Sequence, residues 1–427
     1  MTSRQAFQAP KGTLDVLPPE SWRWEAHIAL FAGIARRAGY GLVVNPMFED
    51  VGVFKRGVGE STDIVSKEMY EFDDKAGRRL ALRPEGTAPV IRAYVQHRPT
   101  PPWKVWYATP SFRYESPQAG RYRQHHQVGV EAVGTDDPDV DVEVISILAE
   151  LIAGVGLRQV DLRINSMGDS SCMPSYREEL VAYLEEHEGE LCPEHQARWR
   201  LNPLRVFDCK KQDCLAVRAG APRIADALCD PCREHFARVE EGLTSLGLEY
   251  RRDDFLVRGF DYYTRTTFEF GALALDAAQN AIGGGGRYDG LVELLGGPPT
   301  PGIGFGSGIE RMLLACDAEG VFPAPTTRLD AFVIDVTGGA VARDLTWELR
   351  QAGFAVDRSF GGRSMKAQFT VANRSGAPVA LIIGDDELAQ DAVTLRHLQG
   401  EGQHEQEVVK RHDLIGRLRD ILSNSAN

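Results

Sequence analysis

The sequence predicts an α+β domain built on an antiparallel sheet and carrying a helical insertion, followed by a small α/β domain. Three features of the 427 residues lead to this fold class. Two apolar strand patterns, Trp103–Pro110 and Gln127–Val133, flank a polar loop and so indicate a long-looped hairpin. Residues from about 170 to 240 are charged and helical in pattern, which interrupts the strand-rich rhythm. Near the C-terminus, short apolar strands alternate with helices, as they do in α/β domains.

The length of the chain requires more than one domain, because single hydrophobic cores stop growing at about 250 to 300 residues. Pro323 and Pro325 mark a linker. We therefore expect a first domain over residues 1–325, with the insertion at about 170–240 inside it. A second domain should occupy residues 326–427.

The first domain should begin with an amphipathic helix at residues 22–39, because Leu30, Phe31 and Ile34 share one face. A short strand at Leu42–Val44 should follow and end before Pro46. The hairpin comes next. The later elements that we expect are a helix at Asp139–Gly154, strands at Val160–Asn165, Phe255–Val257 and Thr266–Phe270, a turn at Gly283–Gly286, and a segment Gly302–Gly308 that leads into a helix from Ile309.

The second domain should contain three short apolar strands separated by helical stretches. They lie at Ala331–Val336, Ala355–Asp357 and Val379–Ile383. Strands that alternate with helices favour a largely parallel sheet.

The composition is that of an ordinary soluble globular protein, with 43% apolar and 26% charged residues. No stretch approaches the ~20 consecutive apolar residues of a membrane span, and Met1–Lys11 lacks the hydrophobic region of a secretory signal. The formal net charge of −13 argues against a protein that coats nucleic acid through positive charge alone. We therefore expect a cytoplasmic protein that does not bind membranes and that contacts any nucleic acid only at particular places.

Five of the seven cysteines lie between residues 192 and 232, which suggests bound metal or free thiols in a chain without an export signal. Cys209-x4-Cys214 together with Cys229-x2-Cys232 can form a tetrahedral zinc site, with Cys192 or His195 nearby. The C-x4-C half is loose for such a motif, however. We therefore include no metal ligand among the candidate site residues.

Two segments have the chemistry to contact phosphate, although no Walker loop is present. In Gly304–Arg311, alternate glycines clear one face of a strand so that a flat base can lie close, and Arg311 follows early in the next helix. The hairpin loop carries Arg113, Arg121 and Arg123, whose planar guanidinium groups can clamp an anion. Tight strand packing and surface ion pairs are the alternative interpretations of these two segments.

These segments resemble motifs of a known enzyme class. Arg113-Tyr114-Glu115 after a strand, and the glycine-rich strand that ends at Arg311, resemble motifs 2 and 3 of the class II aminoacyl-tRNA synthetases. The helix and strand that end at Pro46 look like motif 1, which builds the dimer interface in that class. The segments that are similar to the histidyl-tRNA synthetase family in particular are Leu82–Thr87 and Arg258–Tyr263, with further matches at Lys11–Thr13, Gly284–Asp289 and Gly361–Lys366.

The resemblance implies a class II catalytic domain, a C-terminal anticodon-binding domain and a homodimer. It implies a histidine–tRNA ligase that activates L-histidine with ATP and Mg²⁺ to histidyl-adenylate and pyrophosphate, and then transfers the histidyl group to the 3′-terminal adenosine of tRNA(His). In the second domain, the stretch from Arg358 to Gly384 has four basic residues and no acidic one. Such a stretch can contact phosphates, and an ordinary solvated helix is the alternative.

The resemblance also implies roles for individual residues in binding histidine. Glu85 and Thr87 would bind the ammonium group, Glu131 would contact an imidazole nitrogen, and Tyr262 with Tyr263 would close the pocket. Glu131 should share a strand face with Gln127, since side chains repeat every two residues. A buried, salt-bridged Glu131 among core tyrosines is the alternative. The full histidine set is Glu85, Gly86, Thr87, Arg113, Gln127, Glu131, Arg258, Tyr262 and Tyr263.

The family's chemistry needs charge neutralisation more than a base, because the attacking histidine carboxylate is already an anion. Arg113 and Arg258 are the implied catalytic residues, and they would neutralise charge around the α-phosphate. The implied ATP-binding residues are Arg113, Arg121, Arg123 and Arg311.

Three other functions have to be weighed. A non-catalytic synthetase-like regulatory subunit of histidine biosynthesis would usually lack the last domain and would blur the Arg258–Tyr263 segment, and both are intact here. A synthetase for proline or threonine should lack the Tyr262-Tyr263 pair. A purely nucleic-acid-binding protein fits poorly with the acidic net charge and the complete ATP motifs.

Overall fold

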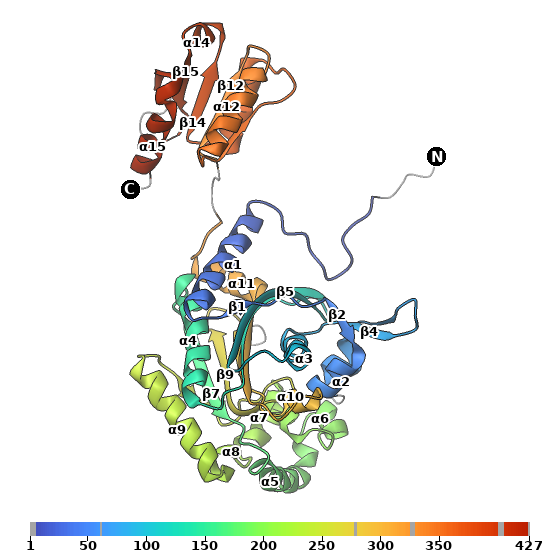
Figure 1. Ribbon diagram of the computed structural model, residues 1–427. Helices are drawn as coiled ribbons and strands as arrows, with labels where there is room; N and C mark the ends of the chain where they lie inside the picture. Colours follow the sequence, from blue (N-terminus) through green and yellow to red (C-terminus); the bar gives the residue numbers. More distant parts are fainter. Residues whose placement is uncertain (1–5, 60–61, 277–279, 325–328, 400–404, 426–427) are drawn as a thin grey trace, which may run out of the picture. The chain divides into compact units, whose positions relative to one another are not determined.

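The structure, a computed structural model, describes residues 6–59, 62–276, 280–324, 329–399 and 405–425 (Figure 1). These residues form two compact units, Met1–Pro323 and Ala324–Asn427. The boundary predicted between residues 325 and 326 lies outside the described residues. Within the described part of the chain, no helix has the length and apolar character needed to cross a membrane.

The first unit is built on one eight-stranded sheet whose neighbouring strands are antiparallel except at its two edges. Its strand order is β1-β5-β6-β11-β10-β9-β7-β8, and only β1 with β5 and β7 with β8 pair in parallel. The fold class expected for this unit, an α+β domain on an antiparallel sheet, is confirmed. In sheet order the strands are β1 Gly41–Leu42, β5 Trp103–Phe112, β6 Gln124–Val133, β11 Gly302–Gly308, β10 Ala281–Arg287, β9 Thr264–Ala272, β7 Val160–Ser166 and β8 Arg251–Arg252.

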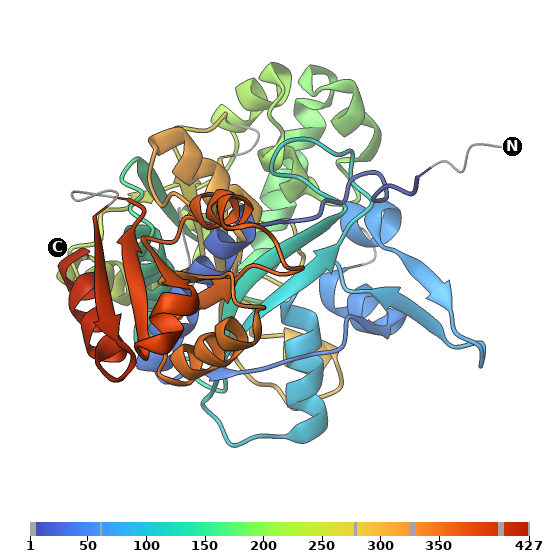
Figure 2. The ribbon, with the colours of Figure 1, turned by 90° about the horizontal axis from the view of Figure 1, so that it is seen from above.

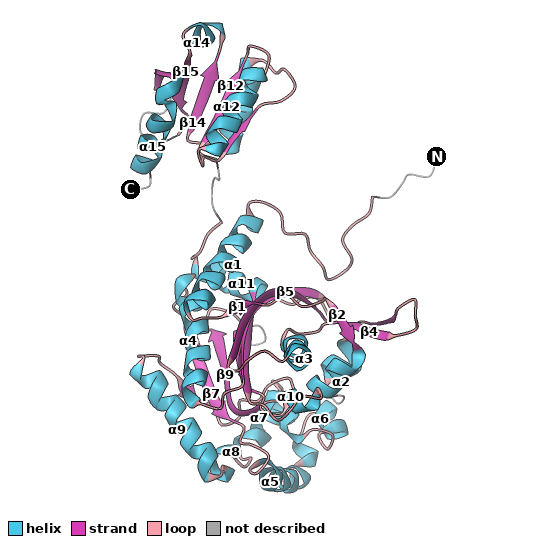
Figure 3. Ribbon diagram, viewed as in Figure 1, coloured by secondary structure: helices cyan, strands magenta, loops and turns pink. Residues whose placement is uncertain are grey.

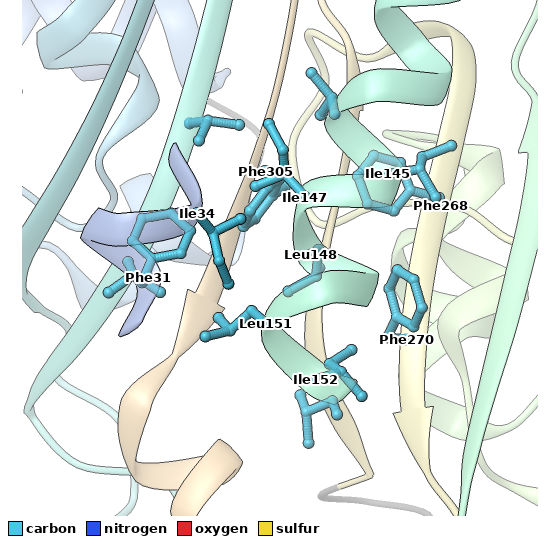
Figure 4. Close-up of a cluster of buried hydrophobic side chains, with 14 of the residues drawn as sticks. Phe31, Ile34, Ile145, Ile147, Leu148, Leu151, Ile152, Phe268, Phe270 and Phe305 are labelled. Atoms are coloured by element: carbon cyan, nitrogen blue, oxygen red, sulfur yellow. The ribbon is translucent and has the colours of Figure 1, made fainter. Parts of the chain in front are cut away.

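The main core lies between this sheet and the helices α1 (Glu20–Arg37), α4 (Pro138–Gly154) and α11 (Ile309–Glu319). Figure 4 shows α4 placing Ile145, Leu148 and Ile152 against the sheet, in the 3–4 spacing of an amphipathic helix. From the strands, Phe268 and Phe305 pack into the same cluster. This core fills one face of the sheet, so any space for a site lies on the opposite face.

A buried ion pair ties α4 to the middle of the sheet. Arg287, the last residue of β10, contacts Asp141 on α4 at 2.6 Å, and neither side chain is exposed. His235 on α9 (Asp230–Ser245) also bonds Asp141, at 2.8 Å. Breaking such a pair by removing one partner leaves a buried charge, so these contacts fix the position of β10.

The other face of the curved sheet is covered by α3 (Thr87–His97), as Figure 1 shows. Helices α2 (Val51–Val58) and α10 (Leu291–Leu294) pack against α3 in a second apolar cluster. A small three-stranded sheet extends from this side of the unit (light blue in Figure 2). Its strands are β2 Phe48–Asp50, β4 Arg79–Leu82 and β3 Glu71–Asp73.

The predicted insertion is helical. Residues 170–240, all of which are described, contain helices and no strand (Figure 3). They enclose a separate apolar core that includes Tyr176, Leu180 and Trp199. Before α9, the helices of this segment are α5 Met173–Glu186, α6 Pro193–Arg198, η3 Pro203–Asp208, α7 Gln212–Ala219 and α8 Ile224–Ala227, with a short η2 at Glu188–Glu190.

The second unit is a five-stranded sheet with helices on both faces. Along β12, Ala331 and Val333 face one apolar cluster and Phe332 and Ile334 face the other, as alternation in a strand requires. The sheet order is β13-β12-β14-β15-β16. The elements are β12 Ala331–Asp335, α12 Ala340–Gln351, β13 Val356–Arg358, α13 Met365–Ser375, β14 Val379–Ile383, α14 Asp385–Ala389, β15 Ala392–His397, β16 Gln406–Lys410 and α15 Leu414–Ser425.

Three sequence-based expectations are corrected by the structure. The largely parallel sheet of the second unit is mixed, because β15 and β16 add two antiparallel strands that we did not predict. Phe255–Val257 is a loop rather than a strand. Gly283–Gly286 is not a turn: it forms the middle of β10, where a Cβ on Gly285 would lie 1.9 Å from the carbonyl oxygen of Gly304.

Candidate active site

A row of glycines forms the floor of the candidate site. Gly129 on β6, Gly306 on β11 and Gly284 on β10 are neighbours in register across three strands. The row ends at Tyr107 on β5 and at Glu269 on β9. A Cβ on Gly129 would lie 2.5 Å from the Tyr107 hydroxyl oxygen, and one on Gly284 would lie 3.0 Å from the Arg258 guanidinium. The absence of side chains leaves a flat surface on which a planar group can lie.

A cavity of about 300 Å³ lies over this floor. Its walls come from the start of α3, the β5–β6 hairpin, the segment before β9, and the start of α11. Ten of the predicted site residues line it together: Glu85, Gly86, Thr87, Arg113, Arg121, Gln127, Arg258, Tyr262, Tyr263 and Arg311.

Two predicted residues lie outside the lining. Glu131 is fully buried directly behind it, with one carboxylate oxygen 2.7 Å from the Thr87 hydroxyl. Arg123 is turned away, because its guanidinium stacks on the Tyr114 ring at 3.8 Å and its Nε donates to the carbonyl of Glu115. In this structure Arg123 therefore supports the hairpin loop rather than the cavity.

One end of the cavity is acidic. The Glu85 carboxylate accepts hydrogen bonds from the backbone amides of Thr87 and Ala88, at 2.5 and 2.7 Å, so it caps the start of α3. Burial raises the pKa of Glu85, while these amides and the Arg113 charge oppose the rise. A cation bound here would stabilise the ionised form of Glu85 and offset the loss of hydration that burial causes.

Glu131 lies behind this acidic end, in a cradle of hydroxyl groups. The Tyr288 hydroxyl donates to one carboxylate oxygen at 2.6 Å, and the Tyr107 hydroxyl is 3.4 Å from the other. Burial raises the pKa of Glu131 to about 8, although the hydrogen bonds from Tyr288 and Thr87 act in the opposite direction. A Cβ on Gly304 would lie 1.7 Å from this carboxylate, so glycine is required on the facing strand.

The other end of the cavity is crowded with arginine. Arg311 donates to the backbone carbonyls of Gly120 and Ala281, which holds its guanidinium beside the hairpin loop. Burial and the neighbouring charges of Arg121 and Arg113 lower the pKa of Arg311. Burial and the same kind of cationic surroundings hold the pKa of His125 well below its usual range. Partly buried arginines that destabilise one another in this way mark an anion-binding site.

Arg258 lies between the two ends and is held by a carboxylate. Its Nη1 is 2.7 Å from Glu269, and the other oxygen of Glu269 is 2.9 Å from Arg163. The guanidinium therefore lies over the glycine floor in a fixed place. Preorganised charge of this kind is what a reaction with developing negative charge requires.

Residues of the site that the sequence analysis did not select include Tyr107, His125, Glu269 and Tyr288. Tyr107, His125 and Glu269 line the cavity, and Tyr288 bonds Glu131 from behind it. Tyr288 lies within the segment Gly284–Asp289 and His125 lies beside the hairpin-loop arginines, so the sequence motifs could have identified both. Glu269 gave no local signal, because its function depends on a partner eleven residues away across a loop.

The cysteines do not form the single four-cysteine group considered from the sequence. Cys209 and Cys214 lie with Cys192 and His195, whereas Cys229 and Cys232 lie with Cys172 and Asp169. The spacing within the C-x4-C and C-x2-C pairs could not reveal this, because the partners come from segments that precede each pair.

The second unit contains a groove lined by cations and by one exposed ring. Arg343, Arg358 and Arg363 line it, together with Phe360. The Arg358 guanidinium lies 4.5 Å from the Phe360 ring, and that ring is 61% exposed. Stacked cations and aromatic rings of this kind are suited to phosphates and unstacked bases.

Comparison with known proteins gives consistent matches over the whole chain. A family model described as histidyl-tRNA synthetase matches residues 12–312, and one described as an anticodon binding domain matches residues 330–421. The histidine–tRNA ligase of Moorella thermoacetica is 46% identical over 401 residues, which cover 93% of this chain and 95% of the relative. That of Rhodococcus erythropolis is 46% identical over 429 residues, which cover 99% and 100%. The crystal structure of apo histidyl-tRNA synthetase from S. aureus matches with a TM-score of 0.81 at 34% identity, and covers 97% of this chain and 100% of that one.

Proposed function

The chain belongs to the histidyl-tRNA synthetase family, and from this premise we propose that its cavity activates L-histidine with ATP and then passes the histidyl group to tRNA(His). A member of this family is an aminoacyl-tRNA ligase. The observation that carries the assignment to this cavity is its division of charge. Glu85, with Glu131 behind it, lies at one end, Arg121 and Arg311 lie at the other, and a glycine floor joins them.

Histidine would lie with its ammonium group and imidazole at the acidic end. Glu85 and Thr87 bind the ammonium group, and Gln127 supports the substrate backbone from the floor. The imidazole N–H donates to Glu131 by replacing the Tyr107 hydroxyl, whose contact of 3.4 Å is the longest that Glu131 makes with a hydroxyl. A site with buried polar groups rejects analogues that lack the matching hydrogen bonds, and so Glu131 contributes to specificity.

Adenylation would take place between the two ends. An oxygen of the histidine carboxylate attacks the α-phosphorus of ATP, and the bond from that phosphorus to the bridging oxygen breaks. Pyrophosphate leaves with the electron pair, and histidyl-adenylate remains. Arg113 and Arg258 neutralise the charge that accumulates around the α-phosphate. The fixed position of Arg258 over the floor supports this role.

The pyrophosphate portion of ATP would occupy the arginine end, held by Arg121 and Arg311. Mg²⁺ is expected with ATP, and carboxylates suited to a hard cation, Glu115 and Glu310, also line this end. When bound, the ion would neutralise the phosphate oxygens. The arginines of the chain supply the remaining positive charge and the orientation.

The second step would join the two units in function. A hydroxyl of the terminal adenosine attacks the carbonyl carbon of the adenylate, and AMP leaves. We propose that the groove of Arg343, Arg358, Arg363 and Phe360 contacts the anticodon of tRNA(His). Its exposed ring offers a stacking surface to an unpaired base.

We propose a homodimer that forms through the segment between α1 and β2. The apolar side chains there are unusually exposed for a single chain: Leu42 at 58%, Val44 at 83% and Met47 at 52%. Contiguous exposed apolar residues are typical of an interaction surface. We also propose a cytoplasmic location, where ATP and tRNA are available.

Amino-acid-dependent ATP–pyrophosphate exchange tests the proposed activity most simply. Each of the twenty amino acids is supplied in turn, and histidine alone should support rapid exchange. Equal exchange with proline or threonine would contradict the substrate. A complete lack of exchange would favour the regulatory-subunit alternative.

A further inference from the structure

The helical insertion contains two groups of metal-ligating side chains that the synthetase reaction does not use. The Cys192 cluster consists of Cys192, His195, Cys209 and Cys214, and all four are buried. The Cys172 cluster consists of Asp169, Cys172, Cys229 and Cys232. In each cluster the four possible ligand atoms lie within 4.8 Å of one another.

The spacing inside the Cys192 cluster matches a tetrahedron. A zinc–sulfur bond of about 2.3 Å implies an edge of about 3.8 Å between ligand atoms in tetrahedral geometry. Here the sulfurs of Cys192 and Cys209 are 3.9 Å apart. Nδ1 of His195 lies 3.3 Å from the Cys192 sulfur and 3.7 Å from the Cys214 sulfur. These separations are much too long for a disulfide, in which the sulfurs are about 2.05 Å apart.

The surroundings of the Cys192 cluster favour thiolates. The backbone amide of Cys192 is 3.4 Å from the Cys214 sulfur and points its hydrogen at it. Such amide contacts are the outer contacts that orient metal ligands. The groove that runs along α6 is lined by His195 and Cys209, so an ion can reach the cluster from outside.

The segments that carry the ligands have little regular structure of their own. The ligands come from the start of α6, the end of η3 and the first turn of α7, and these helices have only six to eight residues each. Helices this short are not stable by themselves, and they need tertiary contacts or a cross-link.

We propose that the insertion is a zinc-binding module in which the Cys192 cluster holds one structural zinc ion. Three thiolates and one imidazole form a closed ligand set that suits zinc and leaves no position for a substrate.

The Cys172 cluster supports a second zinc ion on separate observations. The amide of Cys229 donates to the Cys172 sulfur at 3.1 Å, and the Cys229 sulfur is 4.0 Å from an Asp169 carboxylate oxygen. Cys229 and Cys232 flank the first turn of α9, a helix of 16 residues. The positive end of its dipole stabilises thiolates there. This site would fasten the end of β7 to α9.

The Cys192 zinc would stabilise one wall of the active-site cavity. Asp208, which precedes Cys209, lines the cavity near Arg258. Arg205, in the same η3 turn, donates to the Gly259 carbonyl at 2.6 Å. Loss of the ion should therefore disturb the segment that carries Arg258, even though zinc takes no part in the chemistry.

The test uses the full-length chain, purified without an affinity tag from cells grown with added zinc. Metal analysis should find two zinc ions per chain, one for each cluster. Cys214→Ala should lose one and Cys229→Ala the other, whereas Cys316→Ala, which removes a buried cysteine that belongs to neither cluster, should keep two. Replacement of zinc by cobalt should give the intense visible absorption of tetrahedral thiolate coordination.

His195→Cys keeps the test decisive if the alanine variants do not fold. Cysteine offers another ligand, so this variant should retain both ions and shift the cobalt spectrum toward that of four thiolates. Wild-type protein without zinc, with another metal in its place, or with disulfides among these cysteines would overturn the proposal. If the wild-type protein holds one zinc ion and Cys229→Ala retains it, the Cys172 cluster binds no zinc and the second site is overturned. If Cys214→Ala retains that single ion, the Cys192 cluster binds no zinc and the first site is overturned.

Discussion

Replacing Arg258 by alanine should slow histidine adenylation far more than it weakens substrate binding. The guanidinium lies over Gly284 and is paired with Glu269 at 2.7 Å, so its charge is already in place before the phosphorus becomes crowded. Losing one such preorganised donor costs about 10²–10³ in kcat, or about 2.7–4 kcal/mol. Loss of an interaction that strengthens in the transition state lowers kcat, whereas loss of a contact that is equally strong in the ground state raises KM.

The structure adds a second contribution to this loss. Without Arg258, the Glu269 carboxylate keeps its contact with Arg163, at 2.9 Å, and its negative charge borders the proposed phosphate position. Arg258→Ala combined with Glu269→Gln removes that charge and should recover about tenfold in rate, which corresponds to about 1.4 kcal/mol. Arg258→Lys should restore only part of the activity, because a compact ammonium cannot reproduce the planar fork.

Single-turnover formation of histidyl-adenylate is the assay, with transfer from preformed adenylate measured separately. Adenylation should fall by two or more orders of magnitude, the KM for histidine should shift much less, and transfer should suffer less than adenylation. If Arg258 only supports the strand before Asp261, both steps will fall alike and thermal stability will drop. That result would remove Arg258 from the catalytic residues.

Three further perturbations test other parts of the site. Burial raises the pKa of Glu131 from 4.5 to about 8; because the folded state keeps this proton longer, the carboxyl's stabilising contribution is full below the unfolded pKa and is lost as the pH rises through about 8. In the wild-type protein, the free energy of unfolding should therefore fall by up to about 5 kcal/mol between these two pKa values, and Glu131→Gln should abolish this fall. Urea unfolding at a series of pH values measures it. A variant with the same pH profile as the wild type would contradict the pKa shift. Tyr288→Phe removes a 2.6 Å hydrogen bond to Glu131, and should raise the KM for histidine about tenfold, since a buried group left without its partner costs about 1–3 kcal/mol. An equal rise in the KM for ATP would argue against a local effect. Truncation after Ala324 should leave histidine-dependent exchange largely intact but severely weaken aminoacylation, and wild-type aminoacylation would show that the second unit does not read tRNA.

Periodic apolar patterns predicted most of the first unit, and glycine caused the main error. The helix at Asp139–Gly154 and the two hairpin strands were predicted close to their observed bounds, because burial on one face leaves a clear pattern. Gly283–Gly286 was assigned to a turn because local preference favours one. In the structure, the same glycines let β10 pack closely between β9 and β11 and leave the surface above them open. The need for glycine becomes evident only when the neighbouring strands are in place.

The candidate site could be predicted where its residues fall in compact segments, and not where partners meet across the fold. Glu85, Thr87, Arg113 and Arg258 come from short recognisable stretches, and the structure brings them to one cavity. The contact of Glu269 with Arg258 depends on how the loop before β9 folds back over that strand, which no local pattern specifies. The predicted grouping of the cysteines was wrong for the same reason, since Cys192 comes close to Cys209 and Cys214 only in the folded insertion.

The identity of the tRNA that becomes charged tests the central claim most directly. Purified full-length chain is incubated with ATP, Mg²⁺, all twenty amino acids and unfractionated tRNA, and the charged molecules are identified together with the amino acid each one carries. We expect tRNA(His) alone to become charged, and with histidine alone. Charging of another tRNA, another amino acid on tRNA(His), or no charged tRNA despite active pyrophosphate exchange would contradict it.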